Sequence, residues 1–317
     1  MYQPFLDKIN KAKSIVIFAH RSPDGDCYGA SIALKEVILS NFKNKKVYLA
    51  TSGLPNYFDL LGGGDAIDDE IINSSLGIIV DCSLFYRVED QRVKNCIDLI
   101  CIDHHMDNEE EGLTTIKDTN YNSTCEILVD MFKQLDFIIN EKCASGLCLG
   151  ILTDSGFCRF SKDFSKTFSS LSYLVDLGAK INDIIDISSI QNIDVLDFKS
   201  YLFSSYQVLN SGIIYIVLSK ETLNQFNFSS SEALNYVNSI GNVTNYPIWI
   251  AFVEMDDGSM QVEFRGKNID VHYIASLFNG GGHMFASGCR INTFSLDKIN
   301  EILFTCENYL LDLSGDL

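Results

Sequence analysis

Residues 98–105 read Asp-Leu-Ile-Cys-Ile-Asp-His-His, an apolar run that ends in an acidic residue and two histidines. A short apolar run of this kind is typical of a buried strand, so the polar residues after it lie at the carboxyl end of that strand. Successive strand residues point to opposite faces of a sheet, so we expect His104 and His105 to face opposite sides. One imidazole is then available to bind a metal while the other faces a different group.

The first half of the chain alternates apolar runs with helical patterns. Strands are predicted at 14–19, 46–50, 76–80 and 99–102, and helices at 28–39, 125–135, 143–152 and 168–177. Strands that alternate with helices predict an α/β domain with a mainly parallel sheet covered by helices on both faces. Ligands of such sheets bind beyond the carboxyl ends of the strands.

The second half has a different pattern, which predicts a smaller α+β domain. The periodicity loosens at 182–189, and a bridging helix is predicted at 194–209. Further elements are predicted as strand 212–218, helix 231–240, hairpin strands 248–254 and 260–264, helix 271–278 and helix 296–311. We therefore divide the chain into a first domain at 1–190, a linker helix at 191–210 and a second domain at 211–317.

The composition limits the partners of this protein. The 317 residues are 46% hydrophobic and 21% charged, with a net charge of −18, as in a folded globular protein that lacks a basic face for long nucleic acid. This charge still permits phosphate chemistry if bound cations supply the positive charge. Because no signal peptide and no membrane-spanning run is visible, we expect a cytoplasmic protein without membrane partners. Its ten cysteines form no C-x-x-C pair, and we expect them to be reduced and structural.

Four segments place acidic or imidazole side chains at the ends of strands or helices. They are residues 20–26, 81–83, 103–105 and 153–156. A lone aspartate after a strand is more often a turn residue or helix cap, and two histidines alone are more often surface residues. Together and in order, however, the segments predict a pair of Mn²⁺, Mg²⁺ or Fe²⁺ ions that share a carboxylate. Such a pair, roughly 3.5–4 Å apart, is suited to phosphoester or phosphoanhydride hydrolysis.

At this point the chain resembles the DHH phosphoesterases. The resemblance lies in His20-x-x-x-Asp24-x-Asp26, in Asp81, in Asp103-His104-His105 and in Asp154. It implies that His20, Asp24 and Asp81 bind one metal, and that Asp26, Asp81, His104 and Asp154 bind the other. It also implies that His105 faces the scissile phosphate, that Asp103 orients a histidine, and that a metal-bridging water or hydroxide is the nucleophile.

The second domain resembles the DHH-associated C-terminal domain at Asn279-Gly280-Gly281-Gly282-His283, which lies between Arg265 and Ala286-Ser287-Gly288. The resemblance implies that Arg265 binds a substrate phosphate, that Gly280, Gly281 and Gly282 offer backbone N–H groups, and that His283 assists or stacks on a base. It places the active site between the two domains.

Three further residues are weaker candidates for binding the substrate. Ser123 at the start of a predicted helix is suited either to a phosphate or to N-capping. Arg159 and Lys267 are either substrate-binding cations or solvated surface charges.

With only these two lobes, the chain most resembles the nanoRNase and pAp-phosphatase group. The implied substrates are short RNA, the dinucleotide pApA and 3′-phosphoadenosine 5′-phosphate (pAp), with two divalent ions, Mn²⁺ before Mg²⁺. Long duplex DNA is not an expected partner. A cyclic-dinucleotide phosphodiesterase, a pyrophosphatase-like enzyme and a non-catalytic nucleotide-binding regulator are the alternatives. Whether the protein is a homodimer stays open.

Overall fold

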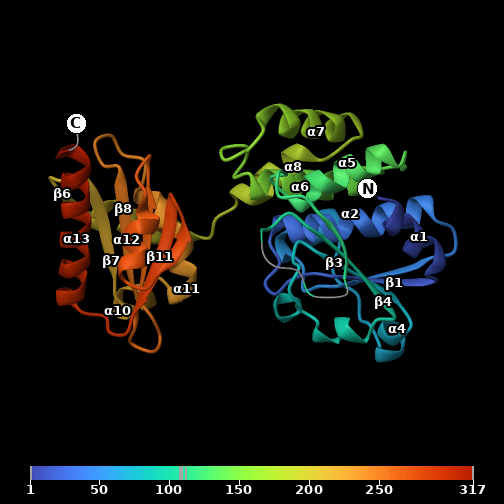
Figure 1. Ribbon diagram of the computed structural model, residues 1–317, viewed down its shortest axis with the longest axis horizontal. Coiled ribbons are helices and arrows are strands. Elements are labelled where there is room, and N and C mark those ends of the chain that lie inside the picture. Colours follow the sequence, from blue (N-terminus) through green and yellow to red (C-terminus); the bar gives the residue numbers. More distant parts are fainter. Residues whose placement is uncertain (1, 107–109, 111–112, 316–317) are drawn as a thin grey trace. The chain divides into compact units, whose positions relative to one another are not determined.

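The computed structural model describes residues 2–106, 110 and 113–315. The chain divides into two compact units, Met1–Ile190 and Gln191–Leu317 (Figure 1). The described residues of each unit form one sheet and two hydrophobic cores.

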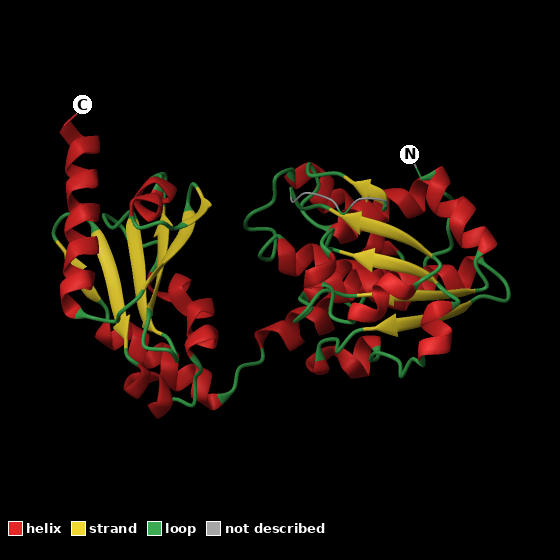
Figure 2. Cartoon of the chain, turned by 60° about the horizontal axis from the view of Figure 1, so that its bottom comes forward, coloured by secondary structure: helices red, strands yellow, loops and turns green. Residues whose placement is uncertain are grey.

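The first unit is built on a five-stranded sheet in the order β2-β1-β3-β4-β5. The strands are β1 (Ser14–Phe18), β2 (Lys46–Ala50), β3 (Leu76–Val80), β4 (Asp98–Asp103) and β5 (Thr114–Lys117). All neighbouring pairs are parallel, and the arrows point the same way in Figure 2. The predicted parallel α/β architecture is confirmed. Strand β5 was not predicted, because only Ile116 among its four residues is buried and no apolar run marks it.

Helices cover both faces of this sheet (Figure 1). They are α1 (Gln3–Lys11), α2 (Gly25–Asn41), α3 (Phe58–Leu61), α4 (Asp69–Asn73), α5 (Thr124–Gln134), α6 (Glu141–Asp154), α7 (Phe164–Asp176) and α8 (Ile181–Ser189), with short 3₁₀ helices at Pro55–Tyr57, Phe85–Arg87 and Gln91–Asn95. Ile15 and Ile17 of β1 belong to the core that contains α2, α5 and α6. Val16 and Phe18 belong to the core that contains Ile72 of α4. Adjacent residues of one strand therefore serve two cores, as the alternation of a strand requires.

The second unit contains a six-stranded mixed sheet in the order β10-β11-β9-β8-β7-β6. The strands are β6 (Gln207–Leu209), β7 (Ile213–Leu218), β8 (Ile248–Glu254), β9 (Met260–Gly266), β10 (Gly281–His283) and β11 (Ala286–Ile291). The helices are α9 (Ile193–Ser205), α10 (Lys220–Gln225), α11 (Ser230–Ala233), the 3₁₀ helix η4 (Leu234–Ile240), α12 (Val271–Leu277) and α13 (Leu296–Gly315). One core contains residues of α12 and α13, and the other contains residues of α9 and η4.

Three predicted elements of the second half need correction. The helix predicted at 194–209 ends at Ser205, because Tyr206 is extended and residues 207–209 pair with β7 as strand β6. The loosened segment 182–189 is helix α8, whose one fully buried residue, Ile184, gives a weak pattern. The helix predicted at 231–240 is α-helical only to Ala233 and continues as a 3₁₀ helix.

No helix in the described part of the chain is long and apolar enough to cross a membrane.

Candidate metal centre

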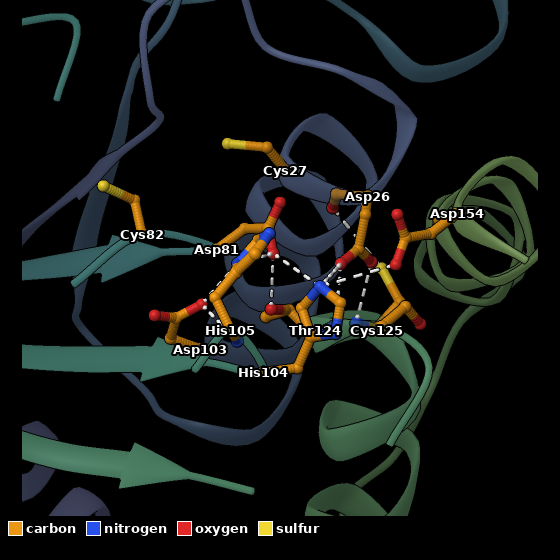
Figure 3. A network of polar contacts seen from close by, with 12 residues as sticks. Asp26, Cys27, Asp81, Cys82, Asp103, His104, His105, Thr124, Cys125 and Asp154 are labelled. Carbon is orange, nitrogen blue, oxygen red and sulfur yellow. Dashed lines mark hydrogen bonds and ion pairs between the residues drawn. The ribbon is translucent and has the colours of Figure 1, made fainter. Parts of the chain in front are cut away.

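The conspicuous acidic and imidazole side chains of the first unit meet at the carboxyl edge of its sheet (Figure 3). His20 follows β1, Asp81 follows β3, and His104 and His105 follow β4. Asp24 caps α2, Asp26 lies in the first turn of α2, and Asp154 ends α6. Three strand ends and two helix ends therefore deliver these groups to one place, as expected for a parallel sheet.

Ligand-type atoms of these residues form three overlapping groups, with the atoms of each group within 4.8 Å of one another. The groups are His20, Asp24 and Asp81; Asp26, His104 and Asp154; and Asp81, His104 and His105. Asp81 and His104 each belong to two groups. Asp81 is placed between the others, since its Oδ2 lies 3.6 Å from His20 Nε2 and its Oδ1 lies 3.5 Å from His104 Nε2.

The surroundings of His104 test whether these residues suit a metal ion. Both ring nitrogens are buried, and neither has a hydrogen-bond partner among the described residues. Oxygens of Asp154, Asp81 and Asp26 lie 3.4, 3.5 and 3.9 Å from His104 Nε2, without hydrogen-bond geometry. A buried polar atom without a partner costs about 1–3 kcal/mol, and a cation between the ring and the carboxylates removes that cost. The donor set therefore fits divalent ions with nitrogen and oxygen ligands.

The electrostatics of the cluster give the same answer. Burial, followed by the charges of Asp81 and Asp24, raises the pKa of Asp154 to about 7. Burial and the charges of Asp81 and Asp154 raise the pKa of Asp26 well above its usual range. Burial also lowers the pKa of His104, which keeps its ring neutral. Three carboxyl groups, those of Asp26, Asp81 and Asp154, are thus held close together beside the neutral ring of His104. Bound cations stabilise such an arrangement, because they offset the repulsion between carboxylates and accept the free imidazole nitrogen.

Close helix packing brings Asp154 to Asp26. A Cβ atom on Gly29 of α2 would meet the carbonyl oxygen of Gly146 in α6, and one on Gly150 would lie 2.6 Å from Asp26 Oδ1. The glycines therefore let the backbones of α2 and α6 approach each other. Asp26 at the start of α2 and Asp154 at the end of α6 consequently fall in one ligand group.

The prediction that His104 and His105 face opposite sides is wrong. Their ring centroids lie 4.3 Å apart with a tilt of 54°, and both rings approach Asp81. Strand β4 ends at Asp103, and the backbone N–H of His105 donates to Asp103 Oδ1 at 3.1 Å. Because this turn ends the strand, the alternation of side chains does not extend to the two histidines.

Asp103 holds the ring of His105. His105 Nδ1 donates to Asp103 Oδ1 at 2.8 Å, and this hydrogen bond raises the pKa of His105. Asp103 Oδ2 accepts a hydrogen bond from Ser83 Oγ and lies 3.6 Å from Lys117 Nζ. Burial alone would raise the pKa of Asp103, but the hydrogen bonds from His105 and Ser83 outweigh it and hold this pKa below its usual range. Sequence reasoning identified Asp103 and His105, but it gave no role to Ser83, which ends the segment 81–83, or to Lys117, which lies outside all four segments.

The N-terminus of α5 is occupied by the protein's own carboxylates. Ser123 is fully buried, and its Oγ accepts from the N–H of Glu126 at 3.1 Å, so this hydroxyl acts as an N-cap rather than facing solvent. The N–H groups of Thr124 and Cys125 donate to Asp26 at 2.7 and 2.9 Å. The anion at this helix end is therefore Asp26, and of the two roles that the sequence left open for Ser123, a phosphate contact or N-capping, the structure shows the N-cap.

The predicted substrate residues of the second unit lie on one part of its sheet. Arg265 of β9 pairs with Ala286 of β11, which pairs with His283 of β10, so the three share one face. Arg265 Nη1 donates to Glu263 Oε2 at 3.0 Å, and His283 is exposed. Gly281 and Gly282 form β10 together with His283, whereas Gly280 precedes it. A Cβ atom on Gly280 would meet the carbonyl oxygen of Gly288, while one on Gly281 would meet nothing within 4 Å.

The two weaker cation candidates lie on the surface. Arg159 is exposed in the first unit, with its guanidinium carbon 5.2 Å from the centre of the Phe160 ring. Lys267 is exposed directly after β9 in the second unit. Neither position decides between a substrate contact and a surface charge.

Comparison with known proteins agrees with the two-unit architecture. Residues 14–151 match the N-terminal domain of the DHH family, and residues 210–311 match the DHHA1 domain. A Streptococcus mutans protein named probable bifunctional oligoribonuclease and PAP phosphatase NrnA is 31% identical, over 98% of this chain and 99% of that protein. The Bacillus subtilis bifunctional oligoribonuclease and PAP phosphatase NrnA is 28% identical, over 93% of this chain and 94% of that protein.

A solved structure shows the same fold. The exopolyphosphatase-related protein from Bacteroides fragilis matches with a TM-score of 0.80 at 22% identity, covering 98% of this chain and 95% of that one. The chain belongs to the DHH family of phosphoesterases. Members of this family depend on divalent metal ions, and the groups around Asp81 and His104 are of a kind that could bind them.

Proposed function

We propose that this protein hydrolyses short oligoribonucleotides, including pApA, to mononucleotides and removes a phosphate from pAp to give AMP. The observation that carries the proposal is the convergence of acidic and imidazole ligands in three groups, of which Asp81 and His104 each belong to two. The names of the NrnA relatives, which this chain matches over almost its whole length, support the choice of substrate.

Two divalent ions fit the grouping of the ligands. In this proposal His20, Asp24 and Asp81 hold one ion, and Asp26, Asp81, His104 and Asp154 hold the other. Mn²⁺ is preferred because it accepts both carboxylate and imidazole, whereas Mg²⁺ usually keeps oxygen ligands and several waters. When bound, such ions activate water and neutralise the charge that develops on a phosphoryl group.

His105 is the proposed proton donor to the phosphoryl oxygens. Asp103 Oδ1 accepts a hydrogen bond from the Nδ1–H of His105 and raises the pKa of the ring, so that Nε2 can carry a proton as well. The side chain of His105 is 37% exposed, which leaves it accessible to a substrate. Asp103 has no exposed surface and acts through His105.

The second unit is proposed to bind the rest of the substrate. Arg265 binds a phosphate, Gly280–Gly282 offer backbone N–H groups, and His283 stacks on a base or assists. Arg159 in the first unit is a further proposed phosphate contact, because it is exposed and its guanidinium contacts only the Phe160 ring among the described residues. The net charge of −18 repels long duplexes, whereas a short substrate needs only these local cations and the metal ions.

Hydrolysis of a small substrate panel tests the proposal. The purified protein is incubated with Mn²⁺ and, separately, pApA, a five-residue RNA, pAp, cyclic di-AMP and pyrophosphate. We expect AMP from the first three substrates and none from a matched Asp81→Asn variant. Cleavage of only cyclic di-AMP or only pyrophosphate would contradict the proposed choice of substrate. Binding of pApA without any hydrolysis would contradict the proposed enzymatic role.

A further inference from the structure

Thr124, the first residue of α5, contacts two of the clustered carboxylates at once (Figure 3). Its hydroxyl donates to Asp81 Oδ1 at 2.8 Å, and its backbone N–H donates to Asp26 Oδ2 at 2.7 Å. Asp81 follows β3 and Asp26 belongs to α2, so a single residue of a third element connects them. Thr124 is itself fully buried, so water does not compete for these hydrogen bonds.

The Asp81 side chain depends on this contact. Asp81 is 1% exposed, and among the described residues the only hydrogen bond to its carboxylate comes from the Thr124 hydroxyl. The nearest ring nitrogens of His20, His104 and His105 lie 3.6, 3.5 and 3.6 Å from its carboxylate oxygens, beyond ordinary hydrogen-bond distance. The backbone of Asp81 is left-handed, with φ at 58°, a conformation that is costly for a residue with a side chain and is often found at functional sites.

Ordinary helix capping does not account for the Thr124 hydroxyl. The N-cap of α5 is Ser123, whose Oγ accepts from the N–H of Glu126. Any residue except proline at position 124 would supply the N–H that donates to Asp26, whereas only a hydroxyl at this position donates to Asp81 in the same way. The side chain of Thr124 therefore has a partner that the fold of α5 does not require.

We propose that Thr124 is a positioning residue that fixes the Asp81 carboxylate relative to Asp26 within the cluster of candidate metal ligands. Its effect on catalysis rests on the proposed function, whereas its effect on metal affinity does not. Groups that hydrogen-bond metal ligands typically contribute about 10- to 100-fold to metal affinity or activity. Loss of the hydroxyl should therefore weaken metal binding and lower kcat without changing KM for pApA.

Two substitutions isolate the hydroxyl. Thr124→Ala and Thr124→Ser both remove the methyl group and differ only in the hydroxyl. Thr115 of β5 provides a matched control, because its buried hydroxyl oxygen has no hydrogen-bond partner among the described residues. Thr115→Ala and Thr115→Ser repeat the same chemical change at a position where the hydroxyl makes no hydrogen bond in the described part of the chain.

The readouts are Mn²⁺ affinity by calorimetric titration of the metal-stripped protein, its melting temperature without metal, and kcat and KM for pApA. We expect Thr124→Ala to bind Mn²⁺ about 10-fold more weakly or worse, with a comparable fall in kcat. Thr124→Ser should stay close to the unmodified protein, and both Thr115 variants should keep its Mn²⁺ affinity, kcat and KM. If Thr124→Ala does not fold, Thr124→Val, which keeps the side-chain volume, replaces it in the comparison with Thr124→Ser.

Wild-type Mn²⁺ affinity in Thr124→Ala, or equal losses in Thr124→Ala and Thr124→Ser, would overturn the proposal. A protein that binds Mn²⁺ but hydrolyses none of the panel would contradict the proposed function alone. In that case the ratio of Mn²⁺ affinities between the two Thr124 variants still decides the role of Thr124.

Discussion

The candidate metal centre of the first unit and the candidate substrate residues of the second differ in how firmly they are held. Asp26, Asp81 and Asp103 are at most 1% exposed, and each is hydrogen-bonded to a neighbouring segment. In the second unit, by contrast, His283 is exposed, and a side chain added at Gly281 would meet nothing within 4 Å. In the proposed function, the first unit carries the chemistry and the second binds the substrate with more freedom to adapt. Changes in the first unit should then affect kcat, and changes in the second should affect KM.

The largest expected effect is that of Asp81→Ala. Because Asp81 belongs to two of the ligand groups, its loss should disturb both proposed ions. Loss of an outer hydrogen bond alone costs about 10- to 100-fold, so we expect kcat for pApA to fall by more than about 1000-fold. Steady-state kinetics in Mn²⁺ measure this. A variant with more than a tenth of the original kcat would show that the two groups do not share a ligand.

His105→Asn should lower kcat about 100-fold or more, because positioned proton donors contribute about 10²–10⁴-fold. Asp103→Asn should lower kcat by less, because it keeps the shape of the hydrogen bond but removes the charge that raises the pKa of His105. Neither variant should bind Mn²⁺ much more weakly than the unmodified protein. If His105→Asn instead loses Mn²⁺, His105 is a metal ligand, as its grouping with Asp81 and His104 also allows.

Arg265→Ala should raise KM for pApA about 10-fold or more with little change in kcat, since a hydrogen bond to a charged group contributes about 1.5–3 kcal/mol. Arg290→Ala is the matched control. Arg290 lies on the neighbouring strand β11, pairs with Asp257 at 2.8 Å and is given no substrate role. A fall in kcat at unchanged KM in Arg265→Ala would contradict the expectation that changes in the second unit affect KM and not kcat.

The smallest expected effect is a pH-dependent change in melting temperature. Burial, then the charges of Asp81 and Asp24, raises the pKa of Asp154 to about 7 in the folded protein, so the protonated form is favoured there. The stabilisation that comes from protonated Asp154 is therefore fully present below pH ~4 and is lost as the pH rises through ~7. Without metal, we expect Asp154→Asn to lose less stability than the unmodified protein between pH 5 and pH 8.

The same protonation competes with metal binding. At one fixed concentration, chosen to be about 100 times the Kd at pH 8, Mn²⁺ should add about 2.7 kcal/mol of stability at pH 8 and less at pH 5, where protonation of the carboxylates raises the Kd. Melting temperatures with and without Mn²⁺ at the two pH values measure it. An equal or larger shift at pH 5 would contradict the role of the carboxylate cluster.

Much of the first unit could be predicted because its signals are local. Apolar runs mark β1, β3 and β4, and the residues after them meet at one edge because parallel strands end there. Strand β5 and helix α8 lack such a signal, since each buries a single residue. The orientation of His105 depends on a turn made by Asp103, and a rule for strands does not apply beyond the end of a strand.

Residues that act through tertiary contacts could not be predicted from their own segments. Thr124 and Asp81 are 43 positions apart, and Ser83 and Lys117 are 34 apart, so no motif spacing connects them. In the second unit, the end of α9 was misplaced because residues 207–209 are extended by pairing with β7 and not by their own pattern.

Titration of the metal-stripped protein with Mn²⁺ during hydrolysis of pApA tests the central claim most directly. We predict no AMP release without metal, and a rate that saturates when two Mn²⁺ ions are bound per chain. AMP release by the metal-stripped protein, or saturated Mn²⁺ binding with no AMP release, would contradict the account.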